Sequence, residues 1–188
     1  MNRRKAIGGI LALTGIGVAS FSGIKFFFGN SNRGQLPNYL NLISELVEVI
    51  IPPTDTPGAK EARVQEYVID FMESCSSNKE YNNFFNGLND LQETCLSDYN
   101  ANFEACTEDQ KIAVLKDLDS TGDANSLFTK INNKIRGRSF FNILKSLTVE
   151  GYCTSELGAT KLLAYAAVPG NYKAITTIKP IQKAWATQ

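Results

Sequence analysis

The sequence predicts an all-α protein, a compact bundle of about six or seven helices preceded by an N-terminal signal or anchor helix. Three observations support this prediction. Apolar residues recur at helical spacing in successive segments, and no run of alternating apolar and polar residues persists. Two capping boxes, Ser77 with Glu80 and Thr107 with Gln110, mark helix starts. A chain of 188 residues is long enough for one domain with a short appendage.

Residues 1–29 have the layout of an export signal. A short basic start is followed by residues 7–24, which carry no charge and are rich in small and aliphatic side chains. The adjacent pair Arg3 and Arg4 resembles the twin-arginine export signal. An ordinary signal-anchor helix is the alternative, because residues 7–28 are long enough to span a bilayer if they are retained.

The helical domain, residues 37–188, follows a polar linker of residues 30–36. Two prolines at 52–53 end its first helix. Adjacent aromatic residues such as Phe84 and Phe85 cannot face the same way on a helix, so one of each pair is expected to meet a second helix layer or a partner. The apolar faces of the first three predicted helices are Tyr39, Leu42, Ile43, Leu46, Val47 and Ile50; Val64, Tyr67, Val68, Phe71, Met72 and Cys75; and Tyr81, Phe84, Phe85, Leu88, Leu91 and Cys95.

The second half of the domain continues the helical pattern. Gly151 suits a helix C-terminus, and a short helix is expected from Ser155 to about Ala166. The tail, residues 171–188, is expected to be irregular and to dock through Trp185. The apolar faces of the later helices are Ile112, Val114, Leu115 and Leu118; Phe128, Ile131 and Ile135; and Phe140, Phe141, Leu144 and Leu147.

The composition excludes several classes of function. The chain has no histidine, which rules out a Ser-His-Asp triad, a Cys-His pair, a histidine-containing zinc site and a C-x-x-C-H haem attachment. Lys and Arg total 19 and so do Asp and Glu, and no basic excess points to nucleic acid. Residues 29–188 alone carry 15 bases and 19 acids, so the body is mildly acidic. Neither a dinucleotide-binding glycine motif after a strand nor a P-loop is present.

Four cysteines, Cys75, Cys95, Cys106 and Cys153, lie in the body. An even number of cysteines in an exported protein favours at least one disulfide, with three possible pairings for two bonds. Their spacings of 20, 11 and 47 residues include no close pair of the kind that structural zinc usually requires. Buried free thiols are the alternative for Cys75 and Cys153, because both fall within apolar patterns.

The segment after the first helix is rich in proline. Its prolines fix the backbone and would limit the entropy lost on docking, so it is either a preformed partner-facing loop or a rigid corner between helices. Tyr152 and Trp185 are likewise candidates for interface anchors or for core packing. The candidate partner-facing residues of the loop are Pro52, Pro53, Thr54, Asp55, Pro57 and Gly58.

Three stretches together carry a family resemblance. They are Ile-Ile-Pro-Pro-Thr-Asp-Thr-Pro-Gly-Ala at 50–59, Leu-Thr-Val-Glu-Gly-Tyr-Cys-Thr-Ser-Glu-Leu-Gly-Ala-Thr at 147–160, and Ala-Val-Pro-Gly-Asn-Tyr at 167–172. With the signal before them, they make the chain similar to the gluconate 2-dehydrogenase subunit 3 family over about residues 36–188. Cys153 departs from the family pattern, which often has an aromatic residue there.

The resemblance implies a small, non-catalytic accessory subunit with no cofactor or metal of its own. Its expected partner is a large FAD-dependent dehydrogenase subunit of the glucose-methanol-choline class, with a haem-bearing c-type cytochrome as a possible third subunit. The small chain would supply the export signal for itself and for the large subunit, and the twin-arginine translocase would export the two together. The complex would then lie in the periplasm or at the inner membrane. Two other interpretations stay open: a membrane-anchored helical binding module without an oxidoreductase partner, and a free-standing exported enzyme.

Overall fold

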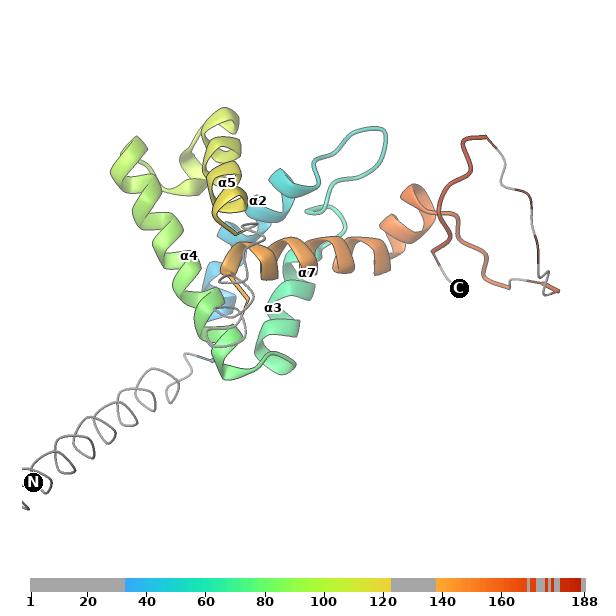
Figure 1. Ribbon diagram of the computed structural model, residues 1–188, viewed down its shortest axis with the longest axis horizontal. Coiled ribbons are helices and arrows are strands. Elements are labelled where there is room, and N and C mark those ends of the chain that lie inside the picture. Colours follow the sequence, from blue (N-terminus) through green and yellow to red (C-terminus); the bar gives the residue numbers. More distant parts are fainter. Residues whose placement is uncertain are drawn as a thin grey trace, which may run out of the picture.

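The structure is a computed structural model that describes residues 33–122 and 138–168, together with residues 170–171, 175, 177 and 180–186 of the tail. Two 3-10 turns and one π-turn supplement the α-helices (Figure 1). In chain order the elements are η1 (Leu36–Tyr39), α2 (Leu40–Ile50), α3 (Val64–Ser74), α4 (Asn78–Tyr99), η2 (Phe103–Ala105), α5 (Glu108–Gly122), α7 (Phe140–Thr154) and η3 (Gly158–Leu162).

The all-α prediction is confirmed for the part of the chain that the structure describes. That part holds five α-helices and no strand, and its isolated β-bridge joins Ala164 to Trp185. The helix expected after Ser155 is reduced to the single turn η3. Within the same described ranges, no helix is long and apolar enough to cross a membrane. The predicted signal and the helix expected around residues 128–135 lie outside the described residues.

Both predicted capping residues cap their helices, and the capping box at Thr107 is complete. The Ser77 hydroxyl accepts the backbone N–H of Glu80 at 3.3 Å at the start of α4. At the start of α5, the Thr107 hydroxyl accepts the N–H of Gln110 at 3.4 Å, and the Gln110 side chain accepts the N–H of Thr107 at 2.9 Å. These bonds satisfy backbone donors that a helix start leaves without partners, which is why the two helices begin where the sequence predicts.

Helix α7 is the central element, and it packs against α2, α3, α4 and α5 (Figure 1). Two glycines allow α7 to lie close to its neighbours α4 and α3. A Cβ on Gly87 of α4 would lie 2.3 Å from Phe140, and a Cβ on Gly151 of α7 would lie 2.5 Å from the ring of Tyr67 in α3. The expectation that Gly151 ends a helix is therefore wrong: α7 runs on to Thr154, and Gly151 is needed for helix packing instead.

The adjacent aromatic pairs bridge helix layers inside the core. Phe84 packs on Phe140 with ring centroids 5.3 Å apart, while its neighbour Phe85 meets Tyr39 edge-on at 5.5 Å. Phe84, Phe85, Phe140 and Phe141 are all buried. Of the two expected destinations for such pairs, a second helix layer or a partner, the structure shows the second layer.

Arg33 fixes the entry of the chain into the bundle. Its guanidinium donates to the backbone carbonyls of Met72 at 3.0 Å, Glu73 at 2.6 Å and Ser76 at 2.5 Å, which lie at the C-terminal end of α3. The same group lies 5.0 Å from the ring centroid of Tyr81. A cation at a helix C-terminus is favourable, and it satisfies carbonyls that the helix leaves open. The end of the predicted linker is thus fastened to the domain.

A charge cluster joins α2 to α5. The Glu45 carboxylate contacts Lys111 and Lys60, each at 2.7 Å. The Lys111 side chain is 10% exposed, so this pair is largely shielded from water. Hydrogen bonds from Lys111 first, and then from Lys60, hold the pKa of Glu45 below its usual value.

Candidate partner-binding surfaces

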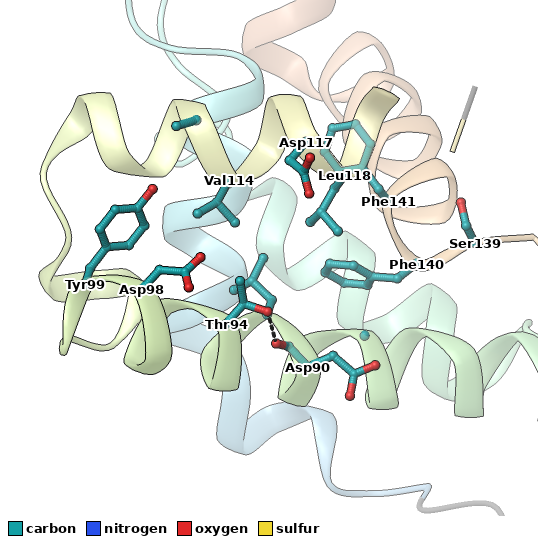
Figure 2. Close-up of a pocket in the computed structure, with 13 residues that line it drawn as sticks. Asp90, Thr94, Asp98, Tyr99, Val114, Asp117, Leu118, Ser139, Phe140 and Phe141 are labelled. Carbon is teal, nitrogen blue, oxygen red and sulfur yellow. Dashed lines mark hydrogen bonds between the residues drawn. The ribbon is translucent and has the colours of Figure 1, made fainter. Parts of the chain in front are cut away.

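A cavity of about 350 Å³ opens between α4, α5 and the start of α7 (Figure 2). Its apolar lining comes from Leu91 of α4, Val114 and Leu118 of α5, and Phe140 and Phe141 of α7. These side chains belong to the core cluster or pack against it, so the floor of the cavity is the edge of the core. Sequence analysis did not single out this groove, because its residues come from three helices that are separate in the chain.

Carboxylates surround the apolar floor. Asp90 and Asp98 of α4 and Asp117 of α5 are exposed residues of the lining. Two hydroxyl groups of the lining make hydrogen bonds within their own helices. Thr94 donates to the Asp90 carbonyl at 2.8 Å (Figure 2). Ser139 accepts the backbone N–H of Asn142 at the start of α7 at 3.4 Å. A groove with an apolar floor and a negatively charged rim is complementary to an apolar side chain that lies next to a positively charged one. This combination is typical of protein-binding surfaces.

The proline-rich loop has a rigid base and an exposed tip. The N–H of Ala59 donates to the Ile51 carbonyl at 2.9 Å, which closes the base, and the N–H of Thr54 donates to the Thr56 carbonyl at 2.9 Å. Pro52, Pro53, Thr54 and Asp55 are exposed. The structure thus shows a rigid corner between helices, and its exposed tip leaves the preformed surface that the partner-facing interpretation requires.

Tyr152 supports this loop from inside the protein. Its side chain is 1% exposed, and its hydroxyl donates to the Pro57 carbonyl at 2.5 Å. Gly58 is also buried, and a Cβ there would lie 2.6 Å from the Glu48 carboxylate. Of the two roles left open for Tyr152, the structure shows core packing, and Gly58 is likewise a packing residue at the base of the loop. Trp185 is 54% exposed and lies beyond η3.

The four cysteines are free thiols, so the expected disulfide is not present in the structure. Cys75 is exposed, and Cys153 is half-buried at the end of α7. The structure brings Cys95 and Cys106 close together in the core. Burial, and then the nearby Cys106 thiol, raise the pKa of Cys95 to about 11, so it stays protonated.

The remaining carboxylates take structural or solvent-exposed positions. Asp119 pairs with Lys145 at 2.9 Å across α5 and α7. Glu156 is exposed, and its carbonyl accepts the hydroxyl of Thr160 one turn later. No group of three or more possible metal ligands occurs among the residues that the structure describes.

An all-helical domain with a rigid exposed loop and an acidic apolar groove defines a class of protein suited to contacts with other proteins. The comparison with known families gives the particular family. The chain matches the gluconate 2-dehydrogenase subunit 3 model over residues 37–170, which is more than half of its length. It therefore belongs to that family, a family of dehydrogenase subunits. No curated protein and no solved structure matches the chain.

Proposed function

We propose that this chain is a non-catalytic small subunit that supports the export, assembly or stability of a large FAD-dependent dehydrogenase of the glucose-methanol-choline class. The family match over residues 37–170 is the observation that carries the proposal. FAD would bind to the large subunit, and a c-type cytochrome subunit would supply haem where one is present. The absence of histidine from the sequence supports a role in which the partners perform the chemistry.

The surfaces of the domain fit such a role. The exposed tip of the proline-rich loop is held rigid by the bond from Tyr152 to Pro57, so little entropy is lost when a partner covers it. The groove between α4 and α5 adds an apolar floor for a partner side chain. The alternatives are a membrane-anchored binding module without an oxidoreductase partner and a free-standing exported enzyme, and they differ from the proposal in predicting no flavoprotein partner.

The proposal also assigns localisation to the periplasm by the twin-arginine route, with Arg3 and Arg4 as the recognised pair. The test is to replace both by lysine in the native host and to follow the large flavoprotein subunit by immunoblotting of cell fractions. We expect the large subunit to remain in the cytoplasm together with the altered small subunit, because its own export would depend on this signal. A large subunit that reaches the periplasm at the normal level would refute the export role.

A further inference from the structure

Two thiols lie close together in the core of the bundle, and the proposed function uses neither of them. Cys95 lies in the last two turns of α4 and is 0% exposed, whereas Cys106 directly follows η2 and is 8% exposed. A single buried thiol packs as a small apolar group. Two neighbouring thiols can in addition be oxidised to a disulfide, so the pair is a candidate site of covalent modification.

The backbone between the two cysteines is held in an ordered turn. After α4 the chain reverses direction through η2 into α5 (Figure 1). Gln92, one turn before Cys95, accepts the backbone N–H of Phe103 at 2.9 Å and donates to the Glu104 carboxylate at 2.8 Å. The N–H of Cys106 donates to the Phe103 carbonyl at 3.2 Å. These bonds fasten η2 to α4, so the backbone itself sets the closeness of the two thiols.

The fold favours this pair over the other pairings of the four cysteines. Cys75 precedes the first residue of α4, and the helical rise from there to Cys95 is about 25 Å. Cys153 lies in the last turn of α7, about 20 Å of helical rise beyond Phe140, where α7 packs on α4. Cysteines that share a disulfide have Cα atoms within about 7 Å of each other. Of the pairings that the sequence leaves open, the structure therefore supports the one that joins Cys95 to Cys106.

We propose that Cys95 and Cys106 form an intramolecular disulfide when the folded chain meets a thiol oxidant that itself carries a disulfide. The structure shows the reduced form of the pair. Thiols stay reduced in the cytoplasm, whereas an oxidising compartment supplies such an oxidant. Only the encounter with that compartment rests on the proposed function, because the reactivity of the pair follows from its position in the fold.

The oxidation takes place by two thiol–disulfide exchanges. The thiol of Cys106, the more exposed of the two, loses its proton and attacks one sulfur of the oxidant, which releases a first thiolate and leaves a mixed disulfide. The Cys95 thiol then loses its proton and attacks the Cys106 sulfur, which releases a second thiolate. The two cysteines lose two protons and two electrons in total, and the disulfide of the oxidant is reduced to two thiols. Burial raises the pKa of Cys95 to about 11, so the second exchange is slow at neutral pH.

The new bond would close a loop that carries one end of the groove. Asp98 and Tyr99, which line the groove, lie between the two cysteines in the chain. A disulfide across such a loop restricts the unfolded chain and thereby stabilises the folded one. We expect the oxidised chain to melt about 5–10 °C higher than the reduced chain. Oxidation would thus make this end of the groove more rigid.

The test uses the purified full chain, which is first reduced and then incubated with oxidised glutathione. The protein is denatured, its free thiols are alkylated, and the chain is cleaved after glutamate, because cleavage at Glu104 separates the two cysteines. Mass spectrometry should then find the peptides 94–104 and 105–108 joined by a disulfide. The variant Cys106→Ala should lose the rise in melting temperature on oxidation. The matched control Cys75→Ala, which alters an exposed thiol, should keep it.

The outcomes separate this proposal from the proposed function. A folded wild-type chain that keeps Cys95 and Cys106 as free thiols after the incubation would overturn the proposal. Joined peptides from the wild-type chain would support it even if Cys106→Ala failed to fold. In the native host, a periplasmic chain with both thiols free would also overturn it. A chain that stays in the cytoplasm with the pair reduced, and that oxidises once purified, would refute the proposed export and leave the disulfide proposal intact.

Discussion

The close approach of α4 and α7 makes the substitution Gly87→Ala a sensitive test of the fold. The new Cβ would lie 2.3 Å from the Cβ of Phe140, whereas carbon atoms in contact prefer about 3.5–4.0 Å. The two helices would therefore have to separate by about 1 Å, or Phe140 would have to leave its position in the core. Either response loosens the contact at which the central helix begins.

The size of the effect follows from two opposing contributions. Overpacking of a core contact costs about 1–3 kcal/mol, and an approach as short as 2.3 Å belongs in the upper half of that range, about 2–3 kcal/mol. Replacing glycine by alanine inside a helix stabilises it by about 1 kcal/mol, which offsets part of that cost. We expect a net loss of about 1–2 kcal/mol in the free energy of unfolding. For a domain of this size that loss corresponds to a melting temperature lower by about 3–6 °C.

The assay is thermal and urea unfolding followed by circular dichroism, with Asn86→Ala as the control. Asn86 is the exposed neighbour of Gly87 in α4, so its replacement tests the propensity gain without the clash. The control should be as stable as the wild type or slightly more so. If Gly87→Ala proved equally stable, α4 and α7 would not be packed as closely as the structure has them.

Four further predictions follow from particular contacts. Arg33→Lys should lower the melting temperature by a few degrees, measured by calorimetry, because a compact ammonium group lacks the planar fork with which the guanidinium reaches the carbonyls of Met72, Glu73 and Ser76. Tyr152→Phe should cost about 1 kcal/mol in urea unfolding and speed proteolysis of the proline-rich loop, since the Pro57 carbonyl loses its donor. Alkylation followed by mass spectrometry should label exposed Cys75 quickly and Cys95 only on unfolding, because burial raises the pKa of Cys95 from 9.0 to about 11. Because the pKa of Glu45 is lower in the folded protein than its ordinary value of 4.5, its ion pairs stabilise the fold above pH 4.5, and this stabilisation is lost as the pH falls below that value. Glu45→Gln should flatten this part of the curve of unfolding free energy against pH. An unchanged curve would contradict the lowered pKa of Glu45.

The sequence was most informative where a local rule determines local structure. The caps at Ser77 and Thr107 formed as expected, because the side chain that defines a helix start also makes the bond that stabilises it. The apolar faces likewise placed α2 to α5 and α7. Gly151 was misassigned for a physical reason. The sequence does not distinguish a glycine that ends a helix from a glycine that makes room for a neighbouring ring. Only the position of Tyr67 in the structure shows that Gly151 is of the second kind.

The binding surfaces were harder to foresee because they depend on tertiary arrangement. The groove joins Leu91, Val114 and Phe140, which no sequence window contains together. The sequence left open whether Tyr152 packs in the core or anchors an interface. The hydrogen bond from its hydroxyl to the Pro57 carbonyl supports packing. The proline-rich loop could be recognised from the sequence because its prolines restrict the backbone. In the structure the tip of this loop is exposed.

The central claim is that this chain works as the partner of a large flavoprotein dehydrogenase. The most direct measurement is affinity purification of the tagged full-length chain from gently solubilised cells of its native host, followed by an absorbance spectrum and mass spectrometry of the co-eluting proteins. The proposal predicts a yellow complex in which a much larger FAD-containing chain is present in near-equal amount. A colourless preparation of the chain alone would contradict it.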